Sequence, residues 1–359
     1  MGPYFEPCVK ALLRSGDRED ADECNLRMSS YEAINVLIGA TTPECTNLVK
    51  QLVPLFCNKL AKCIEQVKAG QKISEQILGL LIGAIQTCIN RLDADILQFA
   101  NGIMRVLIPV FEIPNSTTQE EAFMAIGALA NAIEGRFLAY MNAFAPHLIR
   151  ALTNHQESQV FIVATGALGD VCRALEGGEL PTAFCDNIVT LLLRNLENEI
   201  DRNCKAPILS VFGDIALSVE DRFQKYIKLV MQVLHKASQT TIPDQDDEES
   251  VEFLASLRSH VLDAYAGIVQ GMSQQPRILQ QYFPAIVSYL QFLTNLPDRD
   301  EHKTKSIAGV LVDITQCVGA NQMHGVLRDR STDMLLNDLV KIQDDTARDI
   351  AQMLREFRS

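Results

Sequence analysis

One short phrase recurs along this chain and limits its possible folds more than any other feature. Residues 166–177 read GALGDVCRALEG, and similar phrases are GALANAIEG at 127–135, VFGDIALSVED at 211–221 and GVLVDITQCVG at 309–319. From Val160 to Leu175, apolar residues recur at intervals of three and four, which is the pattern of an amphipathic helix. The chain therefore repeats a helix that has one apolar face to bury.

The spacing of the phrases predicts the architecture. When the four phrases are aligned by sequence similarity, Asn131, Asp170, Asp214 and Asp313 fall into one column. These residues are 39, 44 and 99 positions apart, and the last interval has room for two repeats. A period near 40 residues that contains two helices is typical of HEAT and armadillo repeats. We predict an all-α fold, an α-solenoid superhelix of about eight HEAT repeats, each an antiparallel helix pair, that forms a single array over residues 1–359.

Three stretches depart from the regular period. Residues 239–250 read QTTIPDQDDEES, and we predict that they are an acidic insertion inside the sixth repeat. Residues 321–359 are more polar than the preceding pairs and are predicted to form a C-terminal capping repeat. At the other end, the apolar residues Phe5 and Val9 have no earlier repeat to cover them, so we expect this chain to belong to a longer array.

The charge of the chain favours one kind of partner. The 45 acidic and 32 basic residues give a formal net charge of −13. Such an excess disfavours contact with nucleic acid or an anionic membrane and favours a basic partner. No uncharged run is long and apolar enough to span a bilayer, so we expect no membrane insertion. The ten cysteines form no C-x-x-C motif and are expected to be small core residues in a reducing compartment.

No arrangement of residues predicts catalysis. The six histidines are scattered without H-E-x-x-H or any other ligand spacing. The stretch KTKS at 303–306 lacks the glycines of a phosphate-binding loop, and G-x-S-x-G is missing. We therefore expect a protein that is not an enzyme, with no catalytic residue, no metal site and no cofactor.

The aligned polar column permits two interpretations. In the structural one, each side chain bonds the neighbouring repeat and fixes the stacking angle. In the functional one, the carboxylates line a concave groove and bind Lys or Arg of a ligand, because many partly desolvated ion pairs add up where one exposed pair contributes little. The acidic groove candidates, all predicted on the second helices, are Glu120, Glu121, Glu157, Asp170, Asp214, Glu249, Glu252, Asp263, Glu301 and Asp313.

Aromatic residues and methionines characterise the predicted first helices. Most of them must belong to the core. A minority could line shallow grooves between adjacent first helices on the convex side, where a short aromatic peptide would dock. The candidates for such a groove are Phe99, Met104, Phe137, Met141, Phe144 and Phe184.

Several longer stretches closely resemble the importin-β family of nuclear import receptors. They are QEEAFMAIGALANAIEGRFLAYMNAFAPHL at 119–148, GALGDVCRALEGGELPTAFCDNIVTLLLRNL at 166–196, ILSVFGDIAL at 208–217 and LDAYAGIVQGM at 262–272. The likeness extends from Tyr4 to the end of the chain and corresponds to the C-terminal part of that family's array. A generic HEAT scaffold would share the apolar period but not these consecutive words.

The resemblance implies a role in nuclear import. It implies binding of the basic N-terminal segment of importin-α in the acidic groove, release by Ran-GTP and weak contact with the Phe-Gly repeats of nucleoporins. It also implies a location in cytoplasm and nucleus, including the nuclear pore. The alternative is a static HEAT scaffold that holds a protein complex together. Peptide binding that weakens steeply with salt would favour the receptor.

Overall fold

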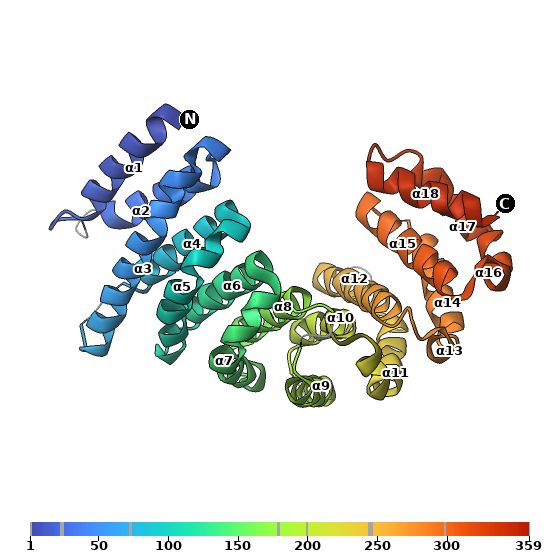
Figure 1. The fold of residues 1–359 in the computed structure, drawn as a ribbon. Helices are drawn as coiled ribbons and strands as arrows, with labels where there is room; N and C mark the ends of the chain where they lie inside the picture. The colour runs from blue at the N-terminus through green and yellow to red at the C-terminus, as the bar shows by residue number, and fades with distance from the viewer. Residues whose placement is uncertain are drawn as a thin grey trace. The chain divides into compact units, whose positions relative to one another are not determined.

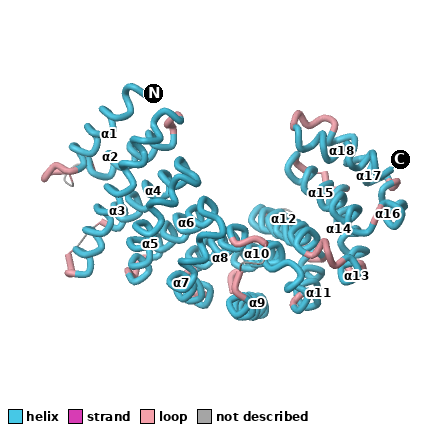
Figure 2. The backbone as a smooth tube through the Cα atoms, in the orientation of Figure 1, coloured by secondary structure: helices cyan, strands magenta, loops and turns pink. Residues whose placement is uncertain are grey.

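A computed structural model describes residues 2–21, 25–71, 74–177, 180–198, 200–242, 247–297 and 299–358. In these ranges the chain forms helices joined by short loops, and no strand occurs (Figures 1 and 2). The helices group into two compact units, Met1–Leu175 (unit 1) and Glu176–Ser359 (unit 2). Each unit is described by itself below.

Unit 1 contains four helix pairs. The first is α1 (Gly2–Gly16) with α2 (Leu26–Gly39), and the second is η1 (Pro43–Cys45) and α3 (Thr46–Lys68) with α4 (Glu75–Leu92). The third is η2 (Asp93–Phe99), α5 (Ala100–Leu107) and η3 (Ile108–Glu112) with α6 (Ser116–Ile133). The fourth is η4 (Glu134–Tyr140) and α7 (Met141–Thr153) with α8 (Ser158–Ala174).

Unit 2 also contains four pairs. They are α9 (Thr182–Glu197) with α10 (Arg202–Val219), then η5 (Glu220–Lys225) and α11 (Ile227–Ser238) with α12 (Glu248–Gly271). Next come α13 (Pro276–Leu279) and α14 (Phe283–Thr294) with α15 (Glu301–Val318), and last α16 (Ala320–Leu327) and α17 (Arg330–Leu339) with α18 (Asp345–Arg358). The described residues thus confirm the predicted α-solenoid of about eight helix pairs.

Within each unit the second helices of successive pairs stack on one another. In unit 1, α2 packs on α4, α4 on α6 and α6 on α8; in unit 2, α10 packs on α12, α12 on α15 and α15 on α18 (Figure 1). The buried residues between them are mainly Ile, Leu, Val, Ala and Phe. Six of the nine described cysteines are buried, as expected of core residues.

Three acidic residues in the left-handed region separate second helices from the next first helices. Asp93, Glu134 and Glu220 have φ values of 47°, 51° and 50°. Each begins a short 3-10 helix that turns the chain back. Two continuous runs, Glu75–Glu112 and Ser116–Thr153, are long and apolar enough to cross a membrane by length and composition. Asp93 and Glu134 break these runs into the separate helices of stacked repeats.

These turns also correct the predicted polar column. Asn131 lies three residues before Glu134, whereas Asp214 lies six residues before Glu220. Aligned at the turns, Asp214 therefore corresponds to Ala128, and Asn131 corresponds to Leu217. Placing Asn131 in one column with Asp214 was wrong, because the repeated words were aligned without knowing where each helix ends.

The predicted acidic insertion lies between α11 and α12. Helix α11 ends at Ser238 and α12 begins at Glu248, so residues 248–250 form the first turn of α12. Residues 243–246 lie outside the described residues. The single array over the whole chain and the capping role of residues 321–359 stay predictions.

Candidate functional site

Three predicted acids come together in unit 1. Glu120 and Glu121 lie in the second turn of α6, and Glu157 is the residue that precedes α8, the helix stacked on α6. Burial and the charge of Glu157 raise the pKa of Glu120, and burial and the charge of Glu120 raise the pKa of Glu121. Among the described residues, none of the three is ion-paired to Lys or Arg. We call Glu120, Glu121 and Glu157 the acidic trio; its negative charge is uncompensated.

Glu121 extends from α6 over the neighbouring helix α4. A Cβ atom on Gly83 of α4 would lie 3.9 Å from Glu121 Oε2 and 3.6 Å from Asn35 Nδ2 of α2. Small residues on α4 thus leave room for polar groups from the helices on either side. Glu121 therefore lies on the face formed by the stacked second helices, with Glu120 beside it in the chain.

Two other predicted acids are bonded to the preceding repeat. Asn131 Nδ2 donates to Asp170 Oδ1 at 2.9 Å, and Gln270 Nε2 donates to Asp313 Oδ2 at 2.7 Å. Both contacts join one second helix to the next, and Asp170 also pairs with Arg173 at 2.7 Å. These contacts favour the structural interpretation for Asp170 and Asp313. Sequence reasoning missed Gln270, because the insertion before it displaces it from the regular period.

The remaining predicted acids lie in unit 2 and do not form one cluster. Glu249 pairs with Arg202 at 2.7 Å. Burial raises the pKa of Asp263, although the nearby His302 partly opposes that shift. Asp214 is half-buried on α10, whereas Glu252 and Glu301 are exposed and have no ion pair within the described ranges.

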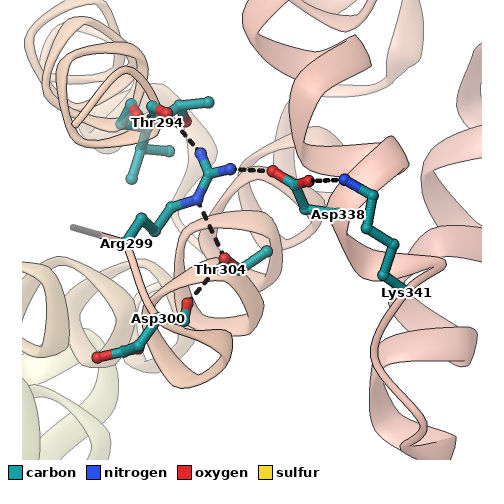
Figure 3. Close-up of polar contacts among 7 residues, drawn as sticks. Thr294, Arg299, Asp300, Thr304, Asp338 and Lys341 are labelled. Atoms are coloured by element: carbon teal, nitrogen blue, oxygen red, sulfur yellow. Dashed lines mark hydrogen bonds and ion pairs between the residues drawn. The ribbon is translucent and has the colours of Figure 1, made fainter. Parts of the chain in front are cut away.

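An enclosed arginine of unit 2, Arg299, forms a structural network (Figure 3). Arg299, whose side chain is 8% exposed, donates to Thr294 O at 2.5 Å and to Thr304 Oγ1 at 3.1 Å, and pairs with Asp338. Lys341 binds the same carboxylate at 2.8 Å. Hydrogen bonding from Lys341 and the charges of Lys341 and Arg299 lower the pKa of Asp338. The network ties α14, α15 and α17 together, so Arg299 is already engaged.

A groove lies between adjacent first helices of unit 1. It has a volume of about 480 Å³ and runs between α3 and the η2–α5 segment. Its lining includes Pro54, Cys57, Asn58, Phe99, Gly102 and Val106. The half-buried ring of Phe99 therefore lies where sequence reasoning placed an aromatic docking groove. We call this cavity the Phe99 groove.

The other aromatic candidates are mostly core residues. Met104 and Met141 are each 4% exposed, and Phe137 and Phe144 are fully buried. The rings of Phe137 and Phe144 pack edge to face at 6.1 Å. Because a docking peptide cannot reach these four side chains, the prediction that they line a surface groove does not agree with the structure. Phe184 is half-buried on α9.

The described residues contain no group of three or more His, Cys, Asp or Glu side chains that could hold a metal ion. Stacked helix pairs, a charged face on the second helices and a groove between first helices are the features of an α-solenoid built from HEAT-type repeats. That is the class of protein that the fold and the candidate site define.

The chain belongs to the importin-β family. Residues 1–339 match the family model described as importin subunit beta-1-like, TPR repeats. The chain is 36% identical over 368 residues to importin subunit beta-1 of Arabidopsis thaliana. This match covers 98% of the chain and 42% of the relative. It therefore spans less than half the length of this relative.

Solved structures share this fold. A crystal structure of importin beta in an ammonium sulfate condition superposes with a TM-score of 0.91 at 29% identity, and covers 99% of this chain and 42% of the other. A structure of a Kap95:Nup1 complex, at 21% identity, shares the fold with a TM-score of 0.86 and covers 99% and 42%. A structure of Kap95p with RanGDP, at 22% identity, shares it with a TM-score of 0.73 and covers 99% and 43%.

Proposed function

We propose that this chain is a segment of a nuclear import receptor that binds the basic N-terminal segment of importin-α, or a basic cargo, on the face of its second helices. The acidic trio of unit 1 is the observation that supports this most directly. Burial and a neighbouring carboxylate raise the pKa of Glu120 and of Glu121, and the trio has no cation of its own among the described residues. A bound Lys or Arg would relieve that repulsion, and burial strengthens each ion pair relative to one in water.

Exposed acids of unit 2 extend the proposal. Glu252 and Glu301, unlike Glu249, are not committed to an arginine of the described chain. Asp170 and Asp313 are proposed to contribute less, because a ligand would have to compete with the amides of Asn131 and Gln270. The binding energy is therefore expected to come mainly from acids without an internal partner.

A matched pair of variants tests the proposal. Glu120, Glu121 and Glu157 are changed together to Gln, and the control changes the exposed acids Glu6, Glu44 and Glu112 to Gln. Both variants alter the net charge by the same amount. Affinity is measured by titration with a fluorescent basic importin-α peptide. If each ion pair contributes roughly 0.5 to 1 kcal/mol, the first variant should lose about 10- to 100-fold in affinity, and the control should lose much less.

Two outcomes would contradict the proposal. An equal loss in both variants would mean that only the net charge matters. Absence of binding to the unmodified chain at low salt would favour the static scaffold instead. A genuine receptor segment should lose peptide affinity steeply between low and physiological ionic strength.

We infer a second contact, with nucleoporin Phe-Gly repeats, at the Phe99 groove. The groove offers the ring of Phe99 and apolar residues such as Pro54 and Val106, with Glu65, Lys68 and Arg105 also in its lining, and the apolar part suits the insertion of a phenylalanine ring. Phe99→Ala should reduce binding of a Phe-Gly peptide in an NMR titration, because the ring contact is lost. A variant with full affinity would exclude the groove as this site.

We further propose that Ran-GTP releases the basic partner and that the protein moves between cytoplasm and nucleus, including the nuclear pore. The family membership and the named Kap95p–RanGDP relative support this proposal. Ran-GTP added to the chain loaded with the fluorescent peptide should displace it, and Ran-GDP should not. Equal effects of both nucleotide forms would contradict release by Ran-GTP.

A further inference from the structure

A short motif recurs near the start of successive first helices. An aromatic residue is followed two positions later by Asn or Asp in Phe99-x-Asn101, Tyr140-x-Asn142 and Phe184-x-Asp186. Tyr226 occupies the same place at the start of α11, with Lys228 two positions later. Within each unit, the repeat therefore places an aromatic residue of one first helix about 40 residues after an Asn or Asp of the preceding one.

Tyrosines at this position form a hydrogen bond across to the preceding first helix. Tyr140 Oη donates to Asn101 Oδ1 at 2.8 Å, over a separation of 39 residues. Tyr226 Oη donates to Asp186 Oδ1 at 2.5 Å, over 40 residues, and Lys225 binds the same carboxylate. Burial and the bond to Asp186 raise the pKa of Tyr226 to about 12, so its hydroxyl keeps its proton and stays a donor. Each tyrosine thus links two adjacent first helices near the start of its own helix.

The Phe99 groove lacks this tie. Phe99 carries no hydroxyl, and the residue that corresponds to Asn101 and Asp186 is Asn58, 41 positions before it. Both Phe99 and Asn58 line the 480 Å³ cavity, and the side chain of Asn58 accepts no hydrogen bond within the described ranges. The cavity therefore lies where, in the repeats that carry Tyr140 and Tyr226, a hydroxyl-to-acceptor bond spans the helices.

We propose that the residue at position 99 determines whether this groove is open, and that Phe99 is the specificity-determining residue that keeps it available for an aromatic side chain of a partner peptide. A tyrosine here would donate to Asn58 and tie the two first helices together across the groove, as Tyr140 and Tyr226 tie theirs. We call this dependence of the groove on residue 99 the opening rule. The identity of the occupant rests on the function proposed above, whereas the opening rule concerns only this chain.

The test uses Cys57, which lines the groove, as a probe independent of any peptide. Its thiol is buried, and burial raises its pKa to about 11, so modification is slow and sensitive to further closure. In Phe99→Tyr, alkylation of Cys57 followed by mass spectrometry should slow by about fivefold, the effect of one added hydrogen bond. Cys63, which is on the same helix but does not line the groove, serves as the internal control and should react unchanged.

A double variant isolates the hydrogen bond. Phe99→Tyr combined with Asn58→Ala removes the acceptor, so the alkylation rate should return close to that of the parent chain. An unchanged rate in Phe99→Tyr, or a slow rate that persists in the double variant, would overturn the inference. Binding of a Phe-Gly peptide should follow the same order; if Cys57 responds as expected but no variant binds the peptide, the opening rule stands and the proposed Phe-Gly contact falls.

Discussion

Replacing Gly267 by alanine should destabilise unit 2, although alanine is the better helix former. Gly267 lies in the interior of α12, opposite Gly213 of α10. A Cβ atom on Gly267 would lie 2.6 Å from the Cα and C atoms of Gly213 and 2.7 Å from its carbonyl oxygen. Carbon atoms prefer separations of roughly 3.5 to 4.0 Å, so the two helix backbones would have to move apart by about 1 Å.

The size of the effect follows from two opposing terms. Forcing an extra methyl group into a packed core costs typically about 1 to 3 kcal/mol, and backbone atoms cannot avoid the contact by changing rotamer. Gly→Ala in a helix interior contributes about 1 kcal/mol in the other direction. Because the clash is with backbone, we expect a cost near the upper end and a net loss of about 1 to 2 kcal/mol in the free energy of unfolding.

Gly309→Ala is the matched control. Gly309 lies inside α15 of the same unit, and a Cβ atom there would meet no atom within 4 Å. This variant should be more stable than the parent chain by up to about 1 kcal/mol. Urea denaturation monitored by far-UV circular dichroism compares the midpoints of the transition. If Gly267→Ala proved as stable as Gly309→Ala, the close approach of α10 and α12 would be refuted.

Three further predictions test single features. Glu134→Gly should raise the thermal midpoint of unit 1, because it relieves a backbone held at φ 51°, worth about 1 kcal/mol, whereas Glu134→Ala should give no such gain. Glu121→Gln should be more stable than the parent chain at pH 7 and equally stable near pH 4. Because the folded state raises the pKa of Glu121, the parent loses stability as the pH rises above 4.5, the ordinary pKa of a glutamate. Thermal unfolding of both chains at several pH values measures this difference. Arg299→Met should reduce hydrogen-exchange protection in α14 and α17 by about 2 to 3 kcal/mol, because it leaves Asp338 without its enclosed partner. Lys341→Met removes the exposed partner of the same carboxylate and should cost less than about 1 kcal/mol of that protection. A parent-like pH profile in Glu121→Gln, or equal losses in the two Asp338-partner variants, would contradict the respective argument.

The architecture could be predicted from the sequence because its signal is local. The repeated phrases contain both the apolar stripe of each second helix and the interval of about 40 residues, and these fix the class of fold without any tertiary information. Helix ends are less visible. The turns at Asp93, Glu134 and Glu220 have a backbone conformation that favours glycine. Because these residues are acidic and not glycine, their residue type does not predict a turn.

The binding residues were harder to predict because their environment comes from the neighbouring repeat. Phe99 and Phe137 are both aromatic and both belong to the 3-10 helices that begin first helices, yet one lines a groove and the other is fully buried. Their register separates them: Phe137 corresponds to Ile96, whereas Phe99 corresponds to Tyr140. The recurring aromatic-x-Asn/Asp motif carries this signal, which apolar periodicity alone does not contain.

The polar contacts between repeats follow the same interval as the helices. Tyr140 and Asn101, Lys225 and Asp186, and Arg299 and Asp338 are each 39 residues apart, as are Lys305 and Asp344. Because each repeat bonds mainly to the one before it, equivalent positions offer nearly equivalent surfaces, and a partner cannot distinguish them by the regular pattern. Selectivity must then arise where one residue departs from the pattern. At position 99 a phenylalanine stands where Tyr140 and Tyr226 form a bridge in their repeats, and a groove lies beside it. Acids without an internal cation leave charge for a ligand to neutralise. Both proposed sites of unit 1 are departures of this kind.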